Sequence, residues 1–272
     1  MIPITGEWFE PGSGFSWCES AYKYQVVSFI AEFANTVTNL PIIVLPLVNI
    51  ALMRKYIAEV NPMLVVPHLL MTTNGLASAY YHATLNIFGQ LIDELSILWL
   101  ILLCLTAYLP VLRLFPPKLA PHIRFIRLTI VLVTLIVSIF AFLKPSVNAF
   151  ALMIISIPSV VVIFYEGMKA GSKDASTAAW FVFVLWALAC AFWCADRALC
   201  DVWLRLGTPY LHAVFHLLSS VSAYTVFVIF SWLDVERRRP QHGFRAAIRF
   251  FPRQCGVFGF PYITLTSRAA QE

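Results

Sequence analysis

Charged residues are scarce in this chain, and their scarcity excludes most soluble folds. Of its 272 residues, 12% are Asp, Glu, Lys or Arg and 60% are hydrophobic. A soluble domain has about 25% charged residues to cover its surface, so we expect this chain to use lipid as its solvent. No basic run is interleaved with aromatic residues in the manner of a nucleic-acid-binding groove, so we exclude a nucleic-acid-binding protein.

The first 25 residues also lack the basic n-region and the apolar h-region of a cleavable signal peptide. They are polar, acidic and aromatic, with Lys23 as their only basic residue. We therefore expect the first membrane helix to act as the targeting element. Internal repeats and low-complexity stretches are absent as well, which predicts one domain with a short tail.

Long apolar runs, in contrast, are abundant. Seven runs of roughly 20 residues, the length that crosses a hydrocarbon core, define the predicted helices. They lie near 27–53, 61–85, 90–110, 124–143, 145–169, 175–197 and 208–233. The sequence thus predicts an all-α membrane protein, a bundle of seven transmembrane helices. We divide the chain into an N-terminal segment (1–26), the transmembrane domain (27–233) and a basic tail (234–272).

Basic residues are distributed unevenly between the two sides of this bundle. Of the 19 Lys and Arg residues, the side of the N-terminus holds only Lys23, Lys144, Arg197 and Arg205. Because basic connections stay in the cytosol, we predict a lumenal N-terminus and a cytosolic C-terminus. The tail segment FRAAIRFFPR mixes arginine with phenylalanine, and we expect it to lie on the anionic leaflet rather than fold separately.

The predicted topology separates the six cysteines. Four of them lie in helices or in the cytosolic tail: Cys104, Cys190, Cys194 and Cys255. Only Cys18 and Cys200 are left in oxidising space, so they are the one pair that could form a stable disulfide. Two free buried thiols are the alternative.

Three histidines are predicted at similar depth near the lumenal side. His212 and His216 lie four residues apart in the last helix, on one face and about 6 Å apart along its axis. Such a pair alone is weak evidence for a metal, but polar side chains in lipid usually face the bundle interior for a functional reason. His82 ends the second helix. Three histidines with one open position are the pattern of catalytic zinc, although imidazole also suits other metals; His68, in mid-helix, is interpreted as a hydrogen-bonded interior residue.

Other polar residues are predicted at the same level. Ser78 lies one turn before His82, on the same helical face, and Asp93 and Glu94 open the third helix. Acidic residues in the first turn of a helix interact favourably with the helix dipole, and we interpret Glu94 in this way. For Asp93 we favour proton transfer or the orientation of a ligand histidine. Asp196 either pairs with the arginine beside it or supports the same site.

An intramembrane carboxylate in the first helix also needs a partner. Glu32 requires a cation, a proton or a hydrogen bond at this depth. Glu19 and the backbone near Trp17 are its predicted neighbours, and oxygen ligands collected in this way could hold calcium. For Asn35 and Asn39, packing inside the bundle is the better interpretation.

Taken together, these motifs resemble the alkaline ceramidase family over nearly the whole chain. The ordered set of Ser-x3-His, an Asp eleven residues on, and His-x3-His is specific, although each piece alone is not. The strings that carry the resemblance are SWCES, AEFANTVTNLP, SAYYHATLNIFGQLIDELSILWL, LKPSVNAFAL, WCADRALCDVW, YLHAVFH, RFFPR and FGFPY.

The resemblance implies a seven-helix fold in endoplasmic reticulum or Golgi membranes that cleaves ceramide with zinc. It matches the zinc ligands to His82, His212 and His216, the catalytic pair to Ser78 and Asp93, and the disulfide to Cys18 and Cys200. The family's calcium ligands match Trp17 (through its carbonyl), Glu19 and Glu32. The family has Asp where this chain has Ser16 and Asn where it has Ala21, so the calcium set is incomplete.

The expected mechanism follows from these parts. Zinc activates a water, Asp93 acts as general base, and Ser78 stabilises the oxyanion. Ceramide would enter from the bilayer, and neither nucleic acid nor an obligate protein partner is expected. The alternative is a seven-helix receptor or lipid sensor with the same three-histidine core. A transporter would show paired repeats and broken helices, and we find none.

Overall fold

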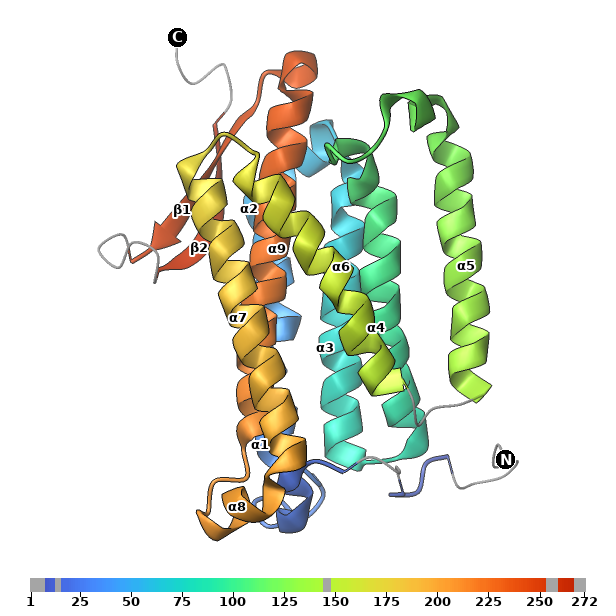
Figure 1. Ribbon diagram of the computed structural model, residues 1–272, viewed down its shortest axis with the longest axis vertical. Helices are drawn as coiled ribbons and strands as arrows, with labels where there is room; N and C mark the ends of the chain where they lie inside the picture. Colours follow the sequence, from blue (N-terminus) through green and yellow to red (C-terminus); the bar gives the residue numbers. More distant parts are fainter. Residues whose placement is uncertain (1–7, 13–15, 144–147, 253–258, 267–272) are drawn as a thin grey trace.

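Long helices running side by side along one axis make up most of the chain (Figure 1). The computed structural model describes residues 8–12, 16–143, 148–252 and 259–266. Within them, seven helices have 20 or more residues. They are α2 (Leu40–Glu59), α3 (Val65–Thr84), α4 (Ile87–Tyr108), α5 (Ile123–Leu143), α6 (Asn148–Met168), α7 (Lys173–Ala198) and α9 (Leu211–His242).

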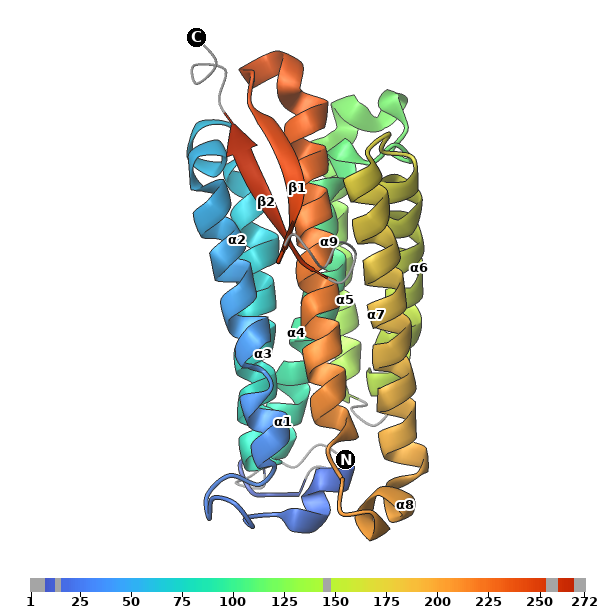
Figure 2. The same ribbon diagram turned by 90° about the vertical axis from the view of Figure 1, so that its left-hand side faces the viewer.

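Short elements occupy the two ends of the bundle. The 3-10 turn η1 (Cys18–Tyr22) and the helices α1 (Phe33–Val37) and α8 (Cys200–Arg205) lie together at one end. At the other end, strands β1 (Arg245–Phe251) and β2 (Phe260–Thr266) form an antiparallel hairpin beside α9 and α2 (Figure 2). Three further 3-10 turns lie in the connections: η2 (Pro62–Leu64), η3 (Leu109–Val111) and η4 (Pro117–His122).

Several of these helices suit a membrane. Five stretches are long and apolar enough to cross one: Phe33–Glu59, Ile87–Val111, Pro117–Phe140, Lys173–Ala198 and Leu211–His242. In α6, residues Leu152–Met168 form a shorter apolar helix, and α3 carries the polar residues Asn74, Ser78 and His82 on one face. The chain is therefore a multi-pass membrane protein, whereas the count of seven spans and the orientation remain predictions.

The outer surface of the bundle is apolar. Helix α5 stands at one side (Figure 1). In the stretch Pro117–Phe140, which covers η4 and most of α5, only 6% of the 18-residue apolar window is buried inside the protein. Phe125, Ile139 and Phe140 are each more than half exposed. Water would penalise such a surface heavily, whereas lipid solvates it.

Inside the bundle, α9 packs against both α7 and α2. The α7 face toward its neighbours is built from fully buried small residues, Ala175, Ala178 and Ala179. Helix α6 approaches α7 at Gly167, where an added Cβ would lie 2.5 Å from the Cβ of Ala179. Small residues allow helix backbones to pack closely without a hydrophobic driving force from water.

The predicted ends of the first and last helices are wrong. Residues 27–32 are not helical, because Val27 pairs with Ile30 in an isolated bridge and α1 begins only at Phe33. Helix α9 continues past 233 to His242. Asp234 does not end the helix because it is fully buried and accepts hydrogen bonds from Tyr56 and Asn61. The predicted domain boundary at 233/234 thus falls inside a helix.

The expectation for the tail is also wrong in part. Within the segment FRAAIRFFPR, Arg245–Phe251 form β1, and the hairpin packs against the helix bundle instead of lying on the membrane surface. Ile248 and Ile263 are buried, whereas Arg245 and Arg249 point outward. Pairing of the two strands satisfies their backbone hydrogen bonds, and the alternation along β1 puts apolar side chains on the buried face and arginines on the exposed face. Lys144 and Cys255 lie outside the described residues.

Candidate metal centre

Three buried imidazoles meet at the end of the bundle that carries α1 and α8. His82 comes from the last turn of α3, and His212 and His216 come from the first turns of α9. One ring nitrogen from each lies within 4.8 Å of the others, and no ring is more than 3% exposed. Three donors at this spacing can reach one ion.

Two of the imidazoles are held by hydrogen bonds on Nδ1. The Nδ1–H of His82 donates to the Glu32 carboxylate (2.5 Å), and the Nδ1–H of His216 donates to the Asn35 carbonyl (3.0 Å). Their Nε2 atoms are left for a ligand. Metal-binding histidines characteristically donate their other N–H to a carboxylate or a carbonyl.

The third imidazole lacks a bond of this kind. Nδ1 of His212 is buried and has no hydrogen-bond partner among the described residues. A buried ring nitrogen without a partner is costly unless it binds something. The residues present therefore fit a three-histidine metal site, and imidazole donors at a buried position suit zinc.

A tight turn brings α4 beside these histidines. Helix α3 ends at Thr84 and is followed by Leu85, which has a left-handed conformation (φ 51°). Asn86 then caps α4 by accepting a hydrogen bond from Gly89 N–H (2.6 Å). A Cβ at Gly89 would lie 2.9 Å from that Asn86 oxygen and 3.0 Å from Tyr81 Cα. Glycine is needed there because the two helices approach so closely.

Ser78 and Asp93 both line the cavity next to the histidines. The Ser78 hydroxyl is near enough to act as a hydrogen-bonding partner of the Asp93 carboxylate, which also interacts electrostatically with His82. Oδ1 of Asp93 is buried without a hydrogen bond to any described residue. One oxygen of this acid is therefore available to a molecule in the cavity.

The acids do not open the helix as predicted. Helix α4 begins at Ile87, so Asp93 and Glu94 lie in its second turn, where the helix dipole has little effect. Glu94 is buried and accepts a hydrogen bond from Gln90 (2.9 Å). His68 fits its prediction, because it contacts Asn49 and the carbonyl of Leu64 inside the bundle.

The cavity itself is about 290 Å³ in volume and is lined by α3, α4, α6, α7 and α9. Ser78, Asp93, His212 and His216 line it near the metal centre, with Trp17 beside them. Its remaining wall is mainly apolar and includes Ile97, Leu100, Leu152, Trp186 and Val226. Such a mainly apolar cavity can accept a hydrocarbon chain, with the histidines, Ser78 and Asp93 as polar groups at the metal centre.

Glu19 and Glu32, the predicted calcium ligands, lie close together but contact protein donors. Glu19 accepts the backbone N–H groups of Ala34 (2.6 Å) and Asn35 (2.8 Å) at the start of α1. Burial raises the pKa of Glu19 above its ordinary value, and these two hydrogen bonds oppose that rise. Glu32 accepts hydrogen bonds from the Ser20 hydroxyl and from the Asn35 amide, in addition to His82.

The other calcium positions contribute little. The carbonyl of Trp17 accepts the N–H of Ser20 (3.0 Å). Ser16 and Ala21, which replace oxygen ligands of the family pattern, are exposed. Calcium needs six to eight oxygen ligands. The described residues do not fit such a site, and we derive no step through calcium.

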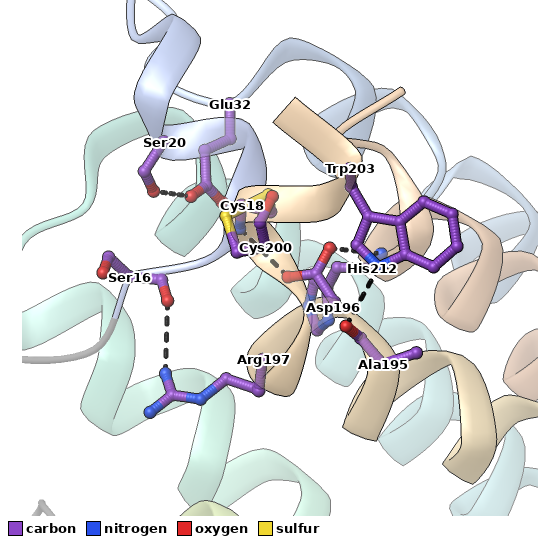
Figure 3. The surroundings of a disulfide bond; sticks show 10 residues. All are labelled: Ser16, Cys18, Ser20, Glu32, Ala195, Asp196, Arg197, Cys200, Trp203 and His212. Atoms are coloured by element: carbon purple, nitrogen blue, oxygen red, sulfur yellow. Dashed lines mark hydrogen bonds between the residues drawn. A yellow bond between two sulfur atoms is a disulfide. The ribbon is translucent and has the colours of Figure 1, made fainter. Parts of the chain in front are cut away.

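A disulfide joins Cys18 to Cys200, with the two Cα atoms 5.4 Å apart. Asp196 lies beside it and accepts two backbone N–H groups, those of Cys18 (3.0 Å) and His212 (3.2 Å) (Figure 3). Of the two interpretations of Asp196, support of the site is the one that these contacts favour. Sequence reasoning missed the Trp17 side chain, whose ring stacks on His212; no spacing pattern relates residues so far apart in the chain.

A family model and three relatives that match this chain carry the name ceramidase. A family model described as Ceramidase matches residues 9–264. The chain is 54% identical to an alkaline ceramidase of Caenorhabditis elegans, over 96% of this chain and 97% of that protein. It is 34% identical to an alkaline ceramidase of Drosophila melanogaster (97% and 92% covered). It is also 33% identical to alkaline ceramidase 1 of Homo sapiens (93% and 94% covered).

Proposed function

Because the chain belongs to the alkaline ceramidase family, we propose that its three-histidine centre binds zinc and cleaves ceramide to sphingosine and a free fatty acid. The chain is an enzyme, a hydrolase of the ceramide amide bond. The observation that supports the proposed centre is the convergence of three buried ring nitrogens at the polar end of an apolar cavity.

His82, His212 and His216 would hold the zinc ion. When bound there, zinc supplies a Lewis acid that lowers the pKa of water and polarises a carbonyl. The hydrogen bonds from His82 to Glu32 and from His216 to Asn35 fix the orientation of two of these rings. Burial of all three rings excludes competing bulk water.

Asp93 is the proposed general base. Its Oδ1 has no bond to a described residue, so it can accept a proton from the attacking water and return it to the leaving amine. A C–O bond forms first at the carbonyl carbon, and the C–N bond then breaks as the leaving amine takes up the proton. The Ser78 hydroxyl, on the same side of the cavity, donates a hydrogen bond to the oxyanion that develops.

Ceramide would reach this centre from the bilayer. The apolar cavity wall suits its hydrocarbon chains, and because apolar helices surround the cavity, we expect it to lie at membrane depth. We propose seven spans in the endoplasmic reticulum or the Golgi, with η1 and α8 on the lumenal side. The Cys18–Cys200 disulfide supports this orientation, because such bonds persist on the oxidising side of these membranes.

Replacement of a ligand histidine tests the proposal. His216→Ala should lose bound zinc and ceramide hydrolysis together, as measured by elemental analysis and by release of fatty acid. His122→Ala is the matched control, because this histidine is exposed in η4. Full hydrolysis by purified His216→Ala would refute the assignment. The receptor alternative is not proposed, since the relatives are named as ceramidases.

A further inference from the structure

The ring of Trp17 lies flat on the ring of His212. Their centroids are 3.5 Å apart and their planes differ by 13°. Trp17 is buried, and the edge of a second indole, Trp193, contacts it with centroids 5.5 Å apart. The stack therefore has a fixed position inside the protein.

His212 is held differently from the other two histidines. His82 and His216 each donate a ring N–H to an oxygen, which prevents the imidazole from turning. No described residue makes a hydrogen bond to Nδ1 of His212. Without a bound ion, rotation of this ring is limited by aromatic contacts: Trp17 stacks on it at the shortest distance, and Phe215 packs against it with centroids 5.1 Å apart.

Covalent and polar contacts fix the position of Trp17. Its neighbour Cys18 is bonded to Cys200, and the Cys18 N–H donates to Asp196. The other oxygen of the same carboxylate accepts the N–H of His212 (Figure 3). One buried acid thus fixes the backbone on both sides of the stack, and the disulfide prevents the N-terminal segment from leaving.

We propose that Trp17 is a positioning residue for the metal ligand His212, held in place by the Cys18–Cys200 disulfide, so that the affinity of the centre for zinc depends on this disulfide. The inference rests on the proposed zinc site. Loss of a group that orients a metal ligand typically lowers metal affinity by about 10- to 100-fold, and we expect a loss of this size when either Trp17 or the disulfide is removed.

The test compares zinc retention by purified full-length variants in detergent micelles, titrated with a chelator of known affinity. Trp17→Ala and the double variant Cys18→Ala/Cys200→Ala should release zinc at about 10- to 100-fold lower chelator activity than the wild type. Trp17→Phe, which keeps a flat ring, should recover most of the affinity. Trp180→Ala is the matched control, because this tryptophan is half exposed on α7, away from the centre.

A second measurement needs no substitution. A phosphine reductant, which does not bind zinc as dithiols do, is added to the folded wild type. The phosphine and one water convert the disulfide to two thiols and the phosphine to its oxide. Zinc affinity should then fall as in the double cysteine variant. This arm remains decisive if Trp17→Ala does not fold.

The outcomes are separable. If Trp17→Ala, or the reduced wild type, holds zinc as tightly as the oxidised wild type, the positioning role is overturned. Equal losses for Trp17→Phe and Trp17→Ala would also overturn it, since a general loss of packing would then account for both. If the oxidised wild type binds no zinc at all, the proposed function itself fails.

Discussion

At the scale of single residues, the buried acids near the centre divide into two kinds. Glu32 and Asp196 accept protein hydrogen bonds with both oxygens: Glu32 from two N–H groups on Oε2 and from the Ser20 hydroxyl on Oε1, and Asp196 from one N–H group on each. Asp93 instead keeps one oxygen free of described protein donors, at the wall of the cavity. Of these three acids, Asp93 is therefore the one available for proton transfer to and from a bound molecule.

Asp93→Asn should therefore lower the rate of ceramide hydrolysis by about 10²- to 10⁴-fold, the usual contribution of a general base. The amide keeps the size of the side chain, so zinc content should stay at the wild-type level. Initial rates of fatty-acid release and elemental analysis check the two parts. Asp174→Asn, at an exposed acid on α7, serves as the control. Near-normal rates in Asp93→Asn would remove this residue from the mechanism.

Part of the centre can be predicted from the sequence because it follows from helical spacing. Ser78 and His82, like His212 and His216, are four residues apart and must share a face. The contacts of Trp17 and Asp196 have no such basis, since they join residues that only the folded chain brings together. Chain spacing also cannot show that Glu19 caps α1 instead of facing an ion.

At the scale of elements, close helix packing depends on positions without a side chain. Gly167 of α6 lies against Ala179 of α7, and a Cβ there would be 2.5 Å from the Ala179 Cβ. Because that neighbour is short and rigid, the two helices would have to move apart. The cavity lies between these helices and α4, so their spacing also shapes it.

Gly167→Ala is expected to lower the free energy of unfolding by about 1–3 kcal/mol, because overpacking costs more than the gain in helix propensity. Thermal unfolding in detergent measures the change. The matched control is Gly12→Ala, where the nearest atom to an added Cβ is the Glu10 carbonyl oxygen at 3.9 Å. A Gly167→Ala protein as stable as the wild type would show that α6 shifts at little cost.

Apolar periodicity predicts that the long helices exist, but not where the first and last of them begin and end. Asp234 reads as the start of a polar tail, yet it lies at 0% exposure with Tyr56, Asn61 and Arg238 around it. Those partners come from other parts of the chain or from the next turn. Because these partners stabilise the buried carboxylate of Asp234, the helix can extend past it, although the charged composition predicts that the helix ends there.

At the scale of the whole molecule, η1 and α8 lie at one end and the hairpin at the other (Figure 1), an arrangement consistent with the seven proposed spans. The proposed orientation places the disulfide end in the lumen. The uneven distribution of basic residues supports the same direction, and it can be tested without reference to activity.

A glycosylation acceptor appended to the N-terminus should be modified when the protein is made in eukaryotic cells, whereas the same acceptor appended to the C-terminus should not. A gel shift that an endoglycosidase removes is the measurement. The sequence has no Asn-x-Ser/Thr acceptor of its own, so any glycosylation that is detected must be at the appended acceptor. Modification at the C-terminus alone would invert the topology.

The covalent link between Cys18 and Cys200 also orders events during biosynthesis. These residues are 182 positions apart, and the chain between them makes helices α2 to α7. The first thiol must wait until six long helices have been synthesised before its partner emerges. A truncated polypeptide that stops before Cys200 cannot form this disulfide. A Cys18–Cys200 bond therefore shows that translation has passed α7, the penultimate long helix.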